Sequence, residues 1–415
     1  MTRRSLASVA AMALITAACS TAVREAEPFV GVWVSEGWGI VLHVHGGDAD
    51  IYEVSSAQCV LASAGSARNI DDVVALDGER LVLTDAGRVV RFDRVTELPA
   101  ACTFEPDPSP AGVLDVVVAS IEEHYHPGVD PGWTERIATV VPPPEGDAAA
   151  LAAAVETLLT PLADAQIALQ TGSDGLWSPV SGGVAEDLAA ALTGGTLLPG
   201  ATIAGDGGLV TADLGDGVRY LGFLRIGGFA GSSDDSQRVL AAVLDHSLEE
   251  ATALVIDLRS TTAGSETEAL LVATRFMPTR TVVATTEARL SDGSTVPAGE
   301  AVVNPMPGGP FPGSVVVLVG PGTSGPAELL VLALAPLPGV TIVGEPTAGS
   351  PRSPLVRTLP NGWLLGVPNT EVITPDGMRH AGAPVVPDVT AALGADDLAA
   401  GRDPGLEAAR SLLAG

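Results

Sequence analysis

The second half of the chain alternates short, continuously apolar segments with helical patterns, and this alternation constrains the fold more than any other feature. The apolar segments lie at 220–226, 253–258, 314–319 and 341–343. The helical patterns between them lie at 233–247, 266–276 and 326–335. A strand that is apolar on both faces must be covered on both faces, as in a parallel sheet flanked by helices. We therefore predict an α/β core in this half of a multidomain α/β chain.

The first hundred residues follow a different pattern, in which apolar and polar positions alternate between Gly and Asp turns. The alternating segments lie at 29–34, 39–44, 51–54, 81–83 and 89–95. A period of two is typical of strands with one buried face. We predict a small all-β barrel or sandwich here, followed by a proline-rich linker and two helical segments.

The resulting division has seven parts. They are a signal peptide (1–18), a tether (19–27), the β domain (28–104), the linker (105–111), a helical subdomain (112–170), the α/β core (171–392) and a C-terminal helix (393–415).

The N-terminus has the organisation of a bacterial export signal. Arg3 and Arg4 precede an apolar stretch that ends at Ala18 and is too short to span a membrane. The sequence Ile-Thr-Ala-Ala-Cys, which ends at Cys19, resembles a lipobox, in which the cysteine becomes the lipidated first residue. We expect an extracytoplasmic protein that contacts the bacterial cell membrane only through this lipid anchor. The alternative is an ordinary secretory signal with an incidental cysteine.

Two cysteines remain once Cys19 is set aside. An even number of cysteines in an oxidising compartment predicts a disulfide, here between Cys59 and Cys102. Two buried free thiols are the alternative.

Charge excludes several functions. The chain has 50 acidic and 21 basic residues, a net charge of −29, and every basic residue is arginine. Nucleic acid is not an expected partner, because a phosphate backbone requires a basic surface. Any mechanism that requires a lysine is excluded.

Metal and cofactor sites are not expected either. His43 and His45 lie two residues apart on one predicted strand and could share a metal ion. No third ligand is evident from the sequence, so we interpret them as a solvated strand face.

Five motifs of the second half occur in the order found in one peptidase family. They are Ala253–Arg259 with Gly264, Val315–Glu328, Gly344–Gly349, Pro375–Gly377 and Val385–Val389. Together they resemble the tail-specific, or C-terminal processing, serine peptidases, and the spacing resembles the branch without a PDZ domain, similar to the tricorn core. The resemblance implies a ββα-superhelix core of the crotonase/ClpP-like type.

The catalytic positions that the resemblance implies hold unusual residues. The family elbow reads T-x-S-x-x-E, and alignment on Thr323 and Glu328 puts Gly325 at the nucleophile position, with Ser324 displaced by one. The base of the Ser–His branch falls on Gln166. The lysine of the Ser–Lys branch falls on Ser350, and His380 in the closing segment is the remaining candidate for a substitute base.

The turn implied for the oxyanion hole is partly present. Gly264 matches its second glycine, whereas Ala263 and Thr261 replace the first glycine and the asparagine. We expect a degenerate peptidase fold that binds extended peptide or protein segments without cleaving them. The alternative is an active serine endopeptidase that uses Ser324.

Overall fold

The computed structural model describes residues 27–66, 74–85, 88–126, 128–172, 175–179, 184–262, 264–352, 354–380 and 382–414. These residues form two compact units. Unit 1 comprises the described residues within 1–180, 286–299 and 354–371, and unit 2 those within 181–285, 300–353 and 372–415. Among the described residues, no helix is both long and apolar enough to cross a membrane.

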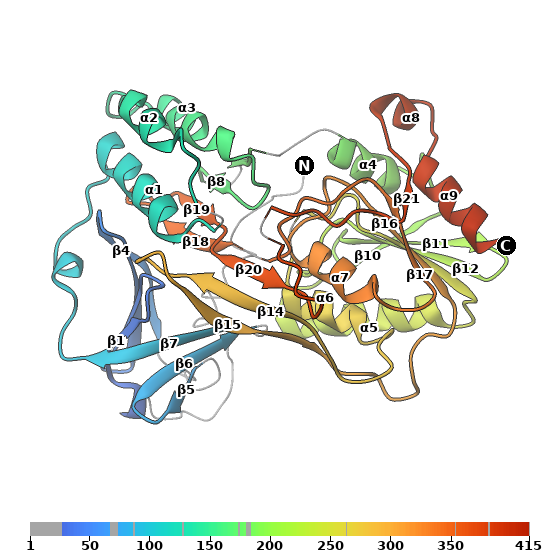
Figure 1. Cartoon of the computed structure of the whole chain (residues 1–415), viewed down its shortest axis with the longest axis horizontal. Coiled ribbons are helices and arrows are strands. Elements are labelled where there is room, and N and C mark those ends of the chain that lie inside the picture. The colour runs from blue at the N-terminus through green and yellow to red at the C-terminus, as the bar shows by residue number, and fades with distance from the viewer. Residues whose placement is uncertain are drawn as a thin grey trace. The chain divides into compact units, whose positions relative to one another are not determined.

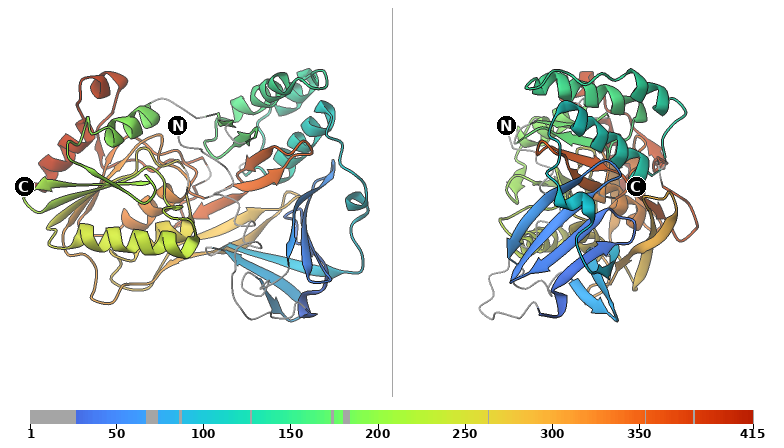
Figure 2. Two further views of the ribbon diagram at one scale, coloured as in Figure 1. Left: turned by 180° about the vertical axis from the view of Figure 1, so that it is seen from behind. Right: turned by 90° about the vertical axis from the view of Figure 1, so that its left-hand side faces the viewer.

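Unit 1 begins with an antiparallel sheet, drawn in blue in Figure 2. Its strands are β1 (Gly31–Ser35), β2 (Ile40–His45), β3 (Asp48–Val54), β4 (Cys59–Ser66), β5 (Val74–Asp77), β6 (Arg80–Asp85) and β7 (Arg88–Val95). The order β7-β1-β2-β3-β4 continues through β6 and β5 beside β7. Trp33, Leu42, Val44 and Ile51 alternate with outward residues and pack into one core. The predicted N-terminal all-β region is confirmed.

Cys59 and Cys102 form the predicted disulfide. Their Cα atoms lie 5.0 Å apart. The bond joins the first residue of β4 to the 3-10 helix η5 (Ala100–Thr103).

A second part of unit 1 is mainly helical. It contains α1 (Pro110–His124), α2 (Trp133–Thr139), α3 (Ala148–Leu159) and the 3-10 helix η6 (Thr160–Leu162). A small sheet of order β18-β19-β8-β9 accompanies them, made of β18 (Leu355–Thr358), β19 (Leu364–Val367), β8 (Ala168–Gln170) and β9 (Leu176–Trp177). Val117, Val155 and Leu365 share its core. α1 begins at Pro110, where the Ser109 hydroxyl accepts the Gly112 N–H and proline occupies the first turn.

Unit 2 is built on a seven-stranded sheet. Its strands, in spatial order, are β10 (Thr202–Ala204), β11 (Leu209–Gly215), β12 (Val218–Phe223), β13 (Ala253–Asp257), β16 (Ser314–Val319), β17 (Val340–Gly344) and β21 (Val389–Thr390). From β12 onward the neighbours are parallel. β13 pairs with β16, and Leu254 lies opposite Val315.

Helices cover both faces of this sheet, as the continuous apolar strands predict (Figure 1). One core joins α5 (Ser233–Leu248), α6 (Glu266–Ala273) and α7 (Pro326–Leu334) to Val315 and Val317 of β16. The other joins α4 (Val184–Thr193), α8 (Ala395–Ala399) and α9 (Pro404–Leu413) to Val316 and Leu318. Successive residues of one strand therefore serve opposite cores.

The structure adds strands that the sequence patterns did not indicate. Among them are β14 (Thr281–Arg289), β15 (Thr295–Val303) and β20 (Thr370–Ile373), and the chain passes from one unit to the other within each of these three. The predicted single helix near the C-terminus is wrong, because it is two helices, α8 and α9. Gly401 has a φ of +66°, and Asp403 caps α9 by accepting the Leu406 N–H before Pro404. A left-handed residue and a proline together end one helix and start another.

A buried ionic cluster connects β13 to α9. The guanidinium of Arg259 donates to both oxygens of Asp257, at 3.0 and 2.6 Å, and to both oxygens of Asp403, each at 2.7 Å. Tyr220 donates its hydroxyl to Asp257 at 2.8 Å. Arg259, Asp257 and Asp403 are all nearly inaccessible to solvent. The two carboxylates supply the hydrogen bonds that a buried guanidinium requires.

We predict that Asp403→Asn lowers the free energy of unfolding by about 3 kcal/mol, the usual order for breaking a buried ion pair. Asparagine is also a good N-cap, so the loss reports the pairing with Arg259 rather than the cap. Urea denaturation measures the change. Asp396→Asn, on exposed α8, is the matched control. Equal stability of the two variants would contradict the prediction.

We also predict that removing the disulfide destabilises the protein. Its cysteines are 43 residues apart, for which loop-closure entropy gives about 4 kcal/mol. The Cys59→Ala/Cys102→Ala variant should unfold at lower urea than the wild type, as followed by tryptophan fluorescence. Reductant should shift the wild type toward the variant and leave the variant unchanged. A wild type insensitive to reductant, with the same midpoint as the variant, would refute this contribution.

Candidate active site

Three loops follow the neighbouring parallel strands β13, β16 and β17, at residues 258–265, 320–325 and 345–350. The carboxyl ends of parallel strands lie at one edge of a sheet, which is where open α/β sheets usually place their functional loops. Most of the residues expected to be catalytic lie in these loops of unit 2.

The loop after β16 is held tightly against the loop after β13. Thr323 donates its hydroxyl to the Leu258 carbonyl at 3.0 Å and accepts the Gly320 N–H at 3.0 Å. Ser324 donates its N–H to the Thr261 carbonyl at 3.2 Å and its hydroxyl to the Thr262 carbonyl at 3.3 Å. The Ser324 side chain is buried, with 2% of its surface exposed. Both donors of Ser324 are therefore used within the fold.

Gly325 occupies the turn from β16 into α7. Its φ of +60° and ψ of −133° lie where residues with a side chain are strained. Its N–H donates to the Ser350 carbonyl at 2.7 Å. Pro326 follows as the first helical residue and has no N–H to offer.

Glu328 lies in the first turn of α7 and is fully buried. Its carboxylate accepts the N–H groups of Gly349 and Ser350, at 2.9 and 2.7 Å, and the hydroxyl of Thr347. Thr347 in turn accepts the Val385 N–H at 2.7 Å. Burial raises the pKa of Glu328 to about 7, although these hydrogen bonds lower it. Glu328 thus shapes the loop after β17.

Gly264 lies against the segment that follows β12. It forms a parallel bridge with Ile226, and a Cβ atom built on it would lie 2.1 Å from the Ile226 carbonyl oxygen. Only glycine fits such a close backbone approach. Thr261 donates its hydroxyl to the Phe223 carbonyl, which fixes the start of the same loop. Ala263 lies outside the described residues.

The remaining expected residues lie elsewhere. Gln166 belongs to unit 1, in the turn before β8, where it is buried and donates its N–H to Asp164 at 2.8 Å. His380 lies in unit 2, with Nδ1 3.2 Å from the Ala383 carbonyl oxygen. Cys19 lies outside the described residues.

The family follows from a direct match. Residues 220–391 match the model of Peptidase family S41. This part of the chain, less than half of its length, is similar to that family. The match begins within β12 and includes all three loops. The predicted resemblance to this peptidase family and the predicted peptidase-like core are therefore confirmed.

Three solved structures are similar to this chain, and the first of them supports the fold. A protein from Parabacteroides merdae, solved as a candidate peptidase, aligns with 74% of this chain and 97% of its own at a TM-score of 0.60 and 21% identity. A lipoprotein from Streptococcus agalactiae covers 77% of this chain and 98% of its own, at a TM-score of 0.49 and 13% identity. The photosystem II D1 C-terminal processing protease covers 74% of this chain and 98% of its own, at a TM-score of 0.40 and 16% identity. No protein of curated function is significantly similar in sequence.

The contact of Asp50 with two histidines, outside the S41 region, was not predicted from the sequence. Asp50 of β3 lies directly opposite His43 of β2 and accepts a hydrogen bond from His45. The pairing of β2 with β3 creates this contact, and only the Gly46-Gly47 turn between two alternating segments could have signalled it.

Glu328 should make stability depend on pH. A carboxyl whose pKa is raised by folding binds its proton more tightly in the folded state. Its contribution to the free energy of unfolding is therefore greatest at low pH and is lost as the pH rises from the unfolded pKa through the folded pKa. We expect a loss of about 1.4 kcal/mol per pH unit between the ordinary value of 4.5 and about 7.

Urea denaturation from pH 5 to pH 8 tests this expectation. Glu328→Gln should remove the pH-dependent component, whereas Glu407→Gln, at an exposed site, should keep it. Parallel pH profiles for the wild type and Glu328→Gln would show that the buried carboxyl does not titrate in this window.

Proposed function

We propose that this protein is an extracytoplasmic, lipid-anchored member of the S41 fold that binds extended peptide segments and does not hydrolyse them. The observation that carries the proposal is the state of Ser324, whose hydroxyl and N–H are both bonded to carbonyls of the neighbouring loop. A serine nucleophile must be accessible and must give its proton to a base. Ser324 is buried, and its hydroxyl donates a hydrogen bond to a carbonyl oxygen, which cannot take up the proton as a base would.

The backbone donors near Ser324 also support the absence of hydrolysis. Strand–turn–helix nucleophile sites, such as those of α/β-hydrolases, use the N–H that follows the nucleophile to stabilise the oxyanion. If Ser324 were the nucleophile, that N–H would belong to Gly325, which already donates to Ser350. If position 325 were the nucleophile, the next residue would be Pro326, which has no N–H. Either alignment lacks this donor.

The base positions complete the argument. Gln166 carries an amide, which does not accept a proton at neutral pH. The chain contains no lysine, and Ser350 stands where the lysine of the other branch would be. Loss of one member of a catalytic unit already removes several orders of magnitude of turnover. These absences support binding rather than catalysis.

An extended peptide is the ligand that this fold suits. Strand addition to a sheet edge relies on backbone hydrogen bonds and requires no catalytic side chain. β10 is an edge strand of the unit 2 sheet, and Ile203 within it is 45% exposed. The lipobox-like sequence ending at Cys19 supports anchoring at the cell membrane, and the charge of −29 argues against nucleic acid as a partner.

Activity measurements test the proposal. The purified wild type should not hydrolyse unfolded casein and should not react with a fluorophosphonate, which labels only activated serines. Ser324→Ala should behave identically, and Ser233→Ala, at an exposed position of α5, serves as the matched control. Labelling or turnover that disappears only in Ser324→Ala would establish the alternative, an active serine endopeptidase that uses Ser324.

Binding is measured separately. The fluorescence anisotropy of a fluorescein-labelled, extended peptide should rise when the protein is added. Mass spectrometry should then recover the peptide intact. The same peptide, N-methylated at alternate residues, cannot form a complete backbone ladder and should bind at least about tenfold more weakly. Equal affinity for both peptides, or no binding of either, would contradict strand addition.

A further inference from the structure

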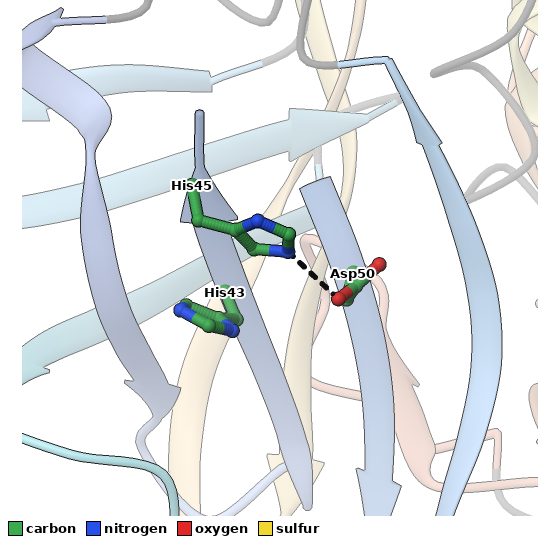
Figure 3. Close-up of side chains that lie close together, drawn as sticks. All are labelled: His43, His45 and Asp50. Carbon is green, nitrogen blue, oxygen red and sulfur yellow. Dashed lines mark hydrogen bonds and ion pairs between the residues drawn. The ribbon is translucent and has the colours of Figure 1, made fainter. Parts of the chain in front are cut away.

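Figure 3 shows three metal-ligating side chains gathered on the N-terminal sheet, far along the chain from the S41 region. His43 and His45 lie on β2, and Asp50 lies on β3. One ligand atom from each side chain lies within 4.8 Å of the others. The Nε2 atom of His45 is 2.9 Å from Oδ2 of Asp50, and the two imidazole rings have centroids 4.4 Å apart.

The backbone places these side chains on one face. Residues two apart on a strand point the same way, so His43 and His45 share a face. His43 and Asp50 are directly opposite in the antiparallel register, and residues so placed have neighbouring side chains. The arrangement therefore follows from regular strand geometry and requires no special loop.

The hairpin that carries the cluster is held by its tight turn and by the core residues on its opposite face. Gly46 and Gly47, both with positive φ, form the tight turn that fixes the register of β2 with β3. On the opposite face, Val44, Ala49 and Ile51 are buried in the core. Ligands on supported strands are held more accurately than ligands on loops.

We propose that His43, His45 and Asp50 bind one Zn²⁺ ion or a similar divalent transition metal ion. Two imidazole nitrogens and one carboxylate oxygen form a ligand set typical of such metals and unlike that of Mg²⁺ or Ca²⁺, which prefer oxygen alone. Bond lengths of about 2.0–2.2 Å separate tetrahedral ligand atoms by roughly 3.4 Å, so small side-chain rotations from the observed positions suffice. The metal takes the place of the proton between His45 and Asp50.

Three protein ligands leave a coordination position open. Three-ligand zinc sites hold water or an external donor there. His45 has 45% of its side chain exposed, so the site is accessible from solvent. A carboxylate or imidazole of a bound molecule could occupy the open position. This proposal is independent of the proposed peptide binding by unit 2.

Isothermal titration of the purified, chelator-treated protein with ZnCl₂ tests the site. We expect one ion per chain, and His43→Ala, His45→Ala and Asp50→Asn should each weaken binding by at least about tenfold, since even residues behind the ligands commonly have that effect. His246→Ala, at an 85% exposed histidine of α5, is the matched control and should keep wild-type affinity. Circular dichroism verifies the fold of each variant.

Two further measurements separate a true site from non-specific binding. Asp50→Glu keeps a carboxylate and should retain more affinity than Asp50→Asn, which a merely structural role of Asp50 would not predict. Co²⁺ should give visible d–d absorption bands that Zn²⁺ abolishes and Mg²⁺ does not. Absence of saturable Zn²⁺ binding, unchanged affinity in folded His45→Ala, or equal loss in His246→Ala would overturn the proposal.

Discussion

The buried guanidinium of Arg259 is the interaction on which the rest of unit 2 depends. Removing a charge from water is costly, and Arg259 is stable in the interior only because Asp257 and Asp403 both accept its hydrogen bonds. One partner ends β13, and the other caps α9. The cluster therefore fixes the start of the loop at 258–265 and fastens the C-terminal helix to the sheet. It also gives the Asp-Leu-Arg sequence a structural role.

The loop that leaves Arg259 determines the state of the neighbouring elbow. Its carbonyl groups at Leu258, Thr261 and Thr262 accept hydrogen bonds from Thr323 and Ser324. In an acyl-transfer site, groups at this sheet edge would be free to act on a substrate. Here they satisfy one another, and the same holds for the Gly325 N–H and the Ser350 carbonyl. Polar groups that are paired within the protein gain little from a transition state, and this is the physical basis of the proposed loss of catalysis.

The sequence predicts those parts of the structure that depend on local patterns. The strands at 253–257 and 314–319, their helices and the N-terminal sheet follow from hydrophobic periodicity. Contacts between distant residues do not follow from it. Arg259 and Asp403 are 144 positions apart, and the proximity of Asp50 to His43 requires knowledge of strand register. The strands β14 and β15 were missed for a related reason, because the chain leaves unit 2 within β14 and returns within β15. The motif alignment places Gly325 at the nucleophile position, but only the three-dimensional structure shows the hydrogen bonds of Ser324.

The motifs that this chain shares with the peptidase family have structural roles, which is why the family similarity is compatible with the proposed absence of hydrolysis. Glu328 and Thr347 organise the turn after β17 through buried hydrogen bonds. Gly264 is required by the close approach of the Ile226 backbone, and Arg259 by its two carboxylates. None of these roles needs a nucleophile or a base. A family match that rests on such residues reports that the sheet and its loops are built in the same way. The proposed absence of hydrolysis rests instead on positions 325 and 166, which hold a glycine with a positive φ and a glutamine.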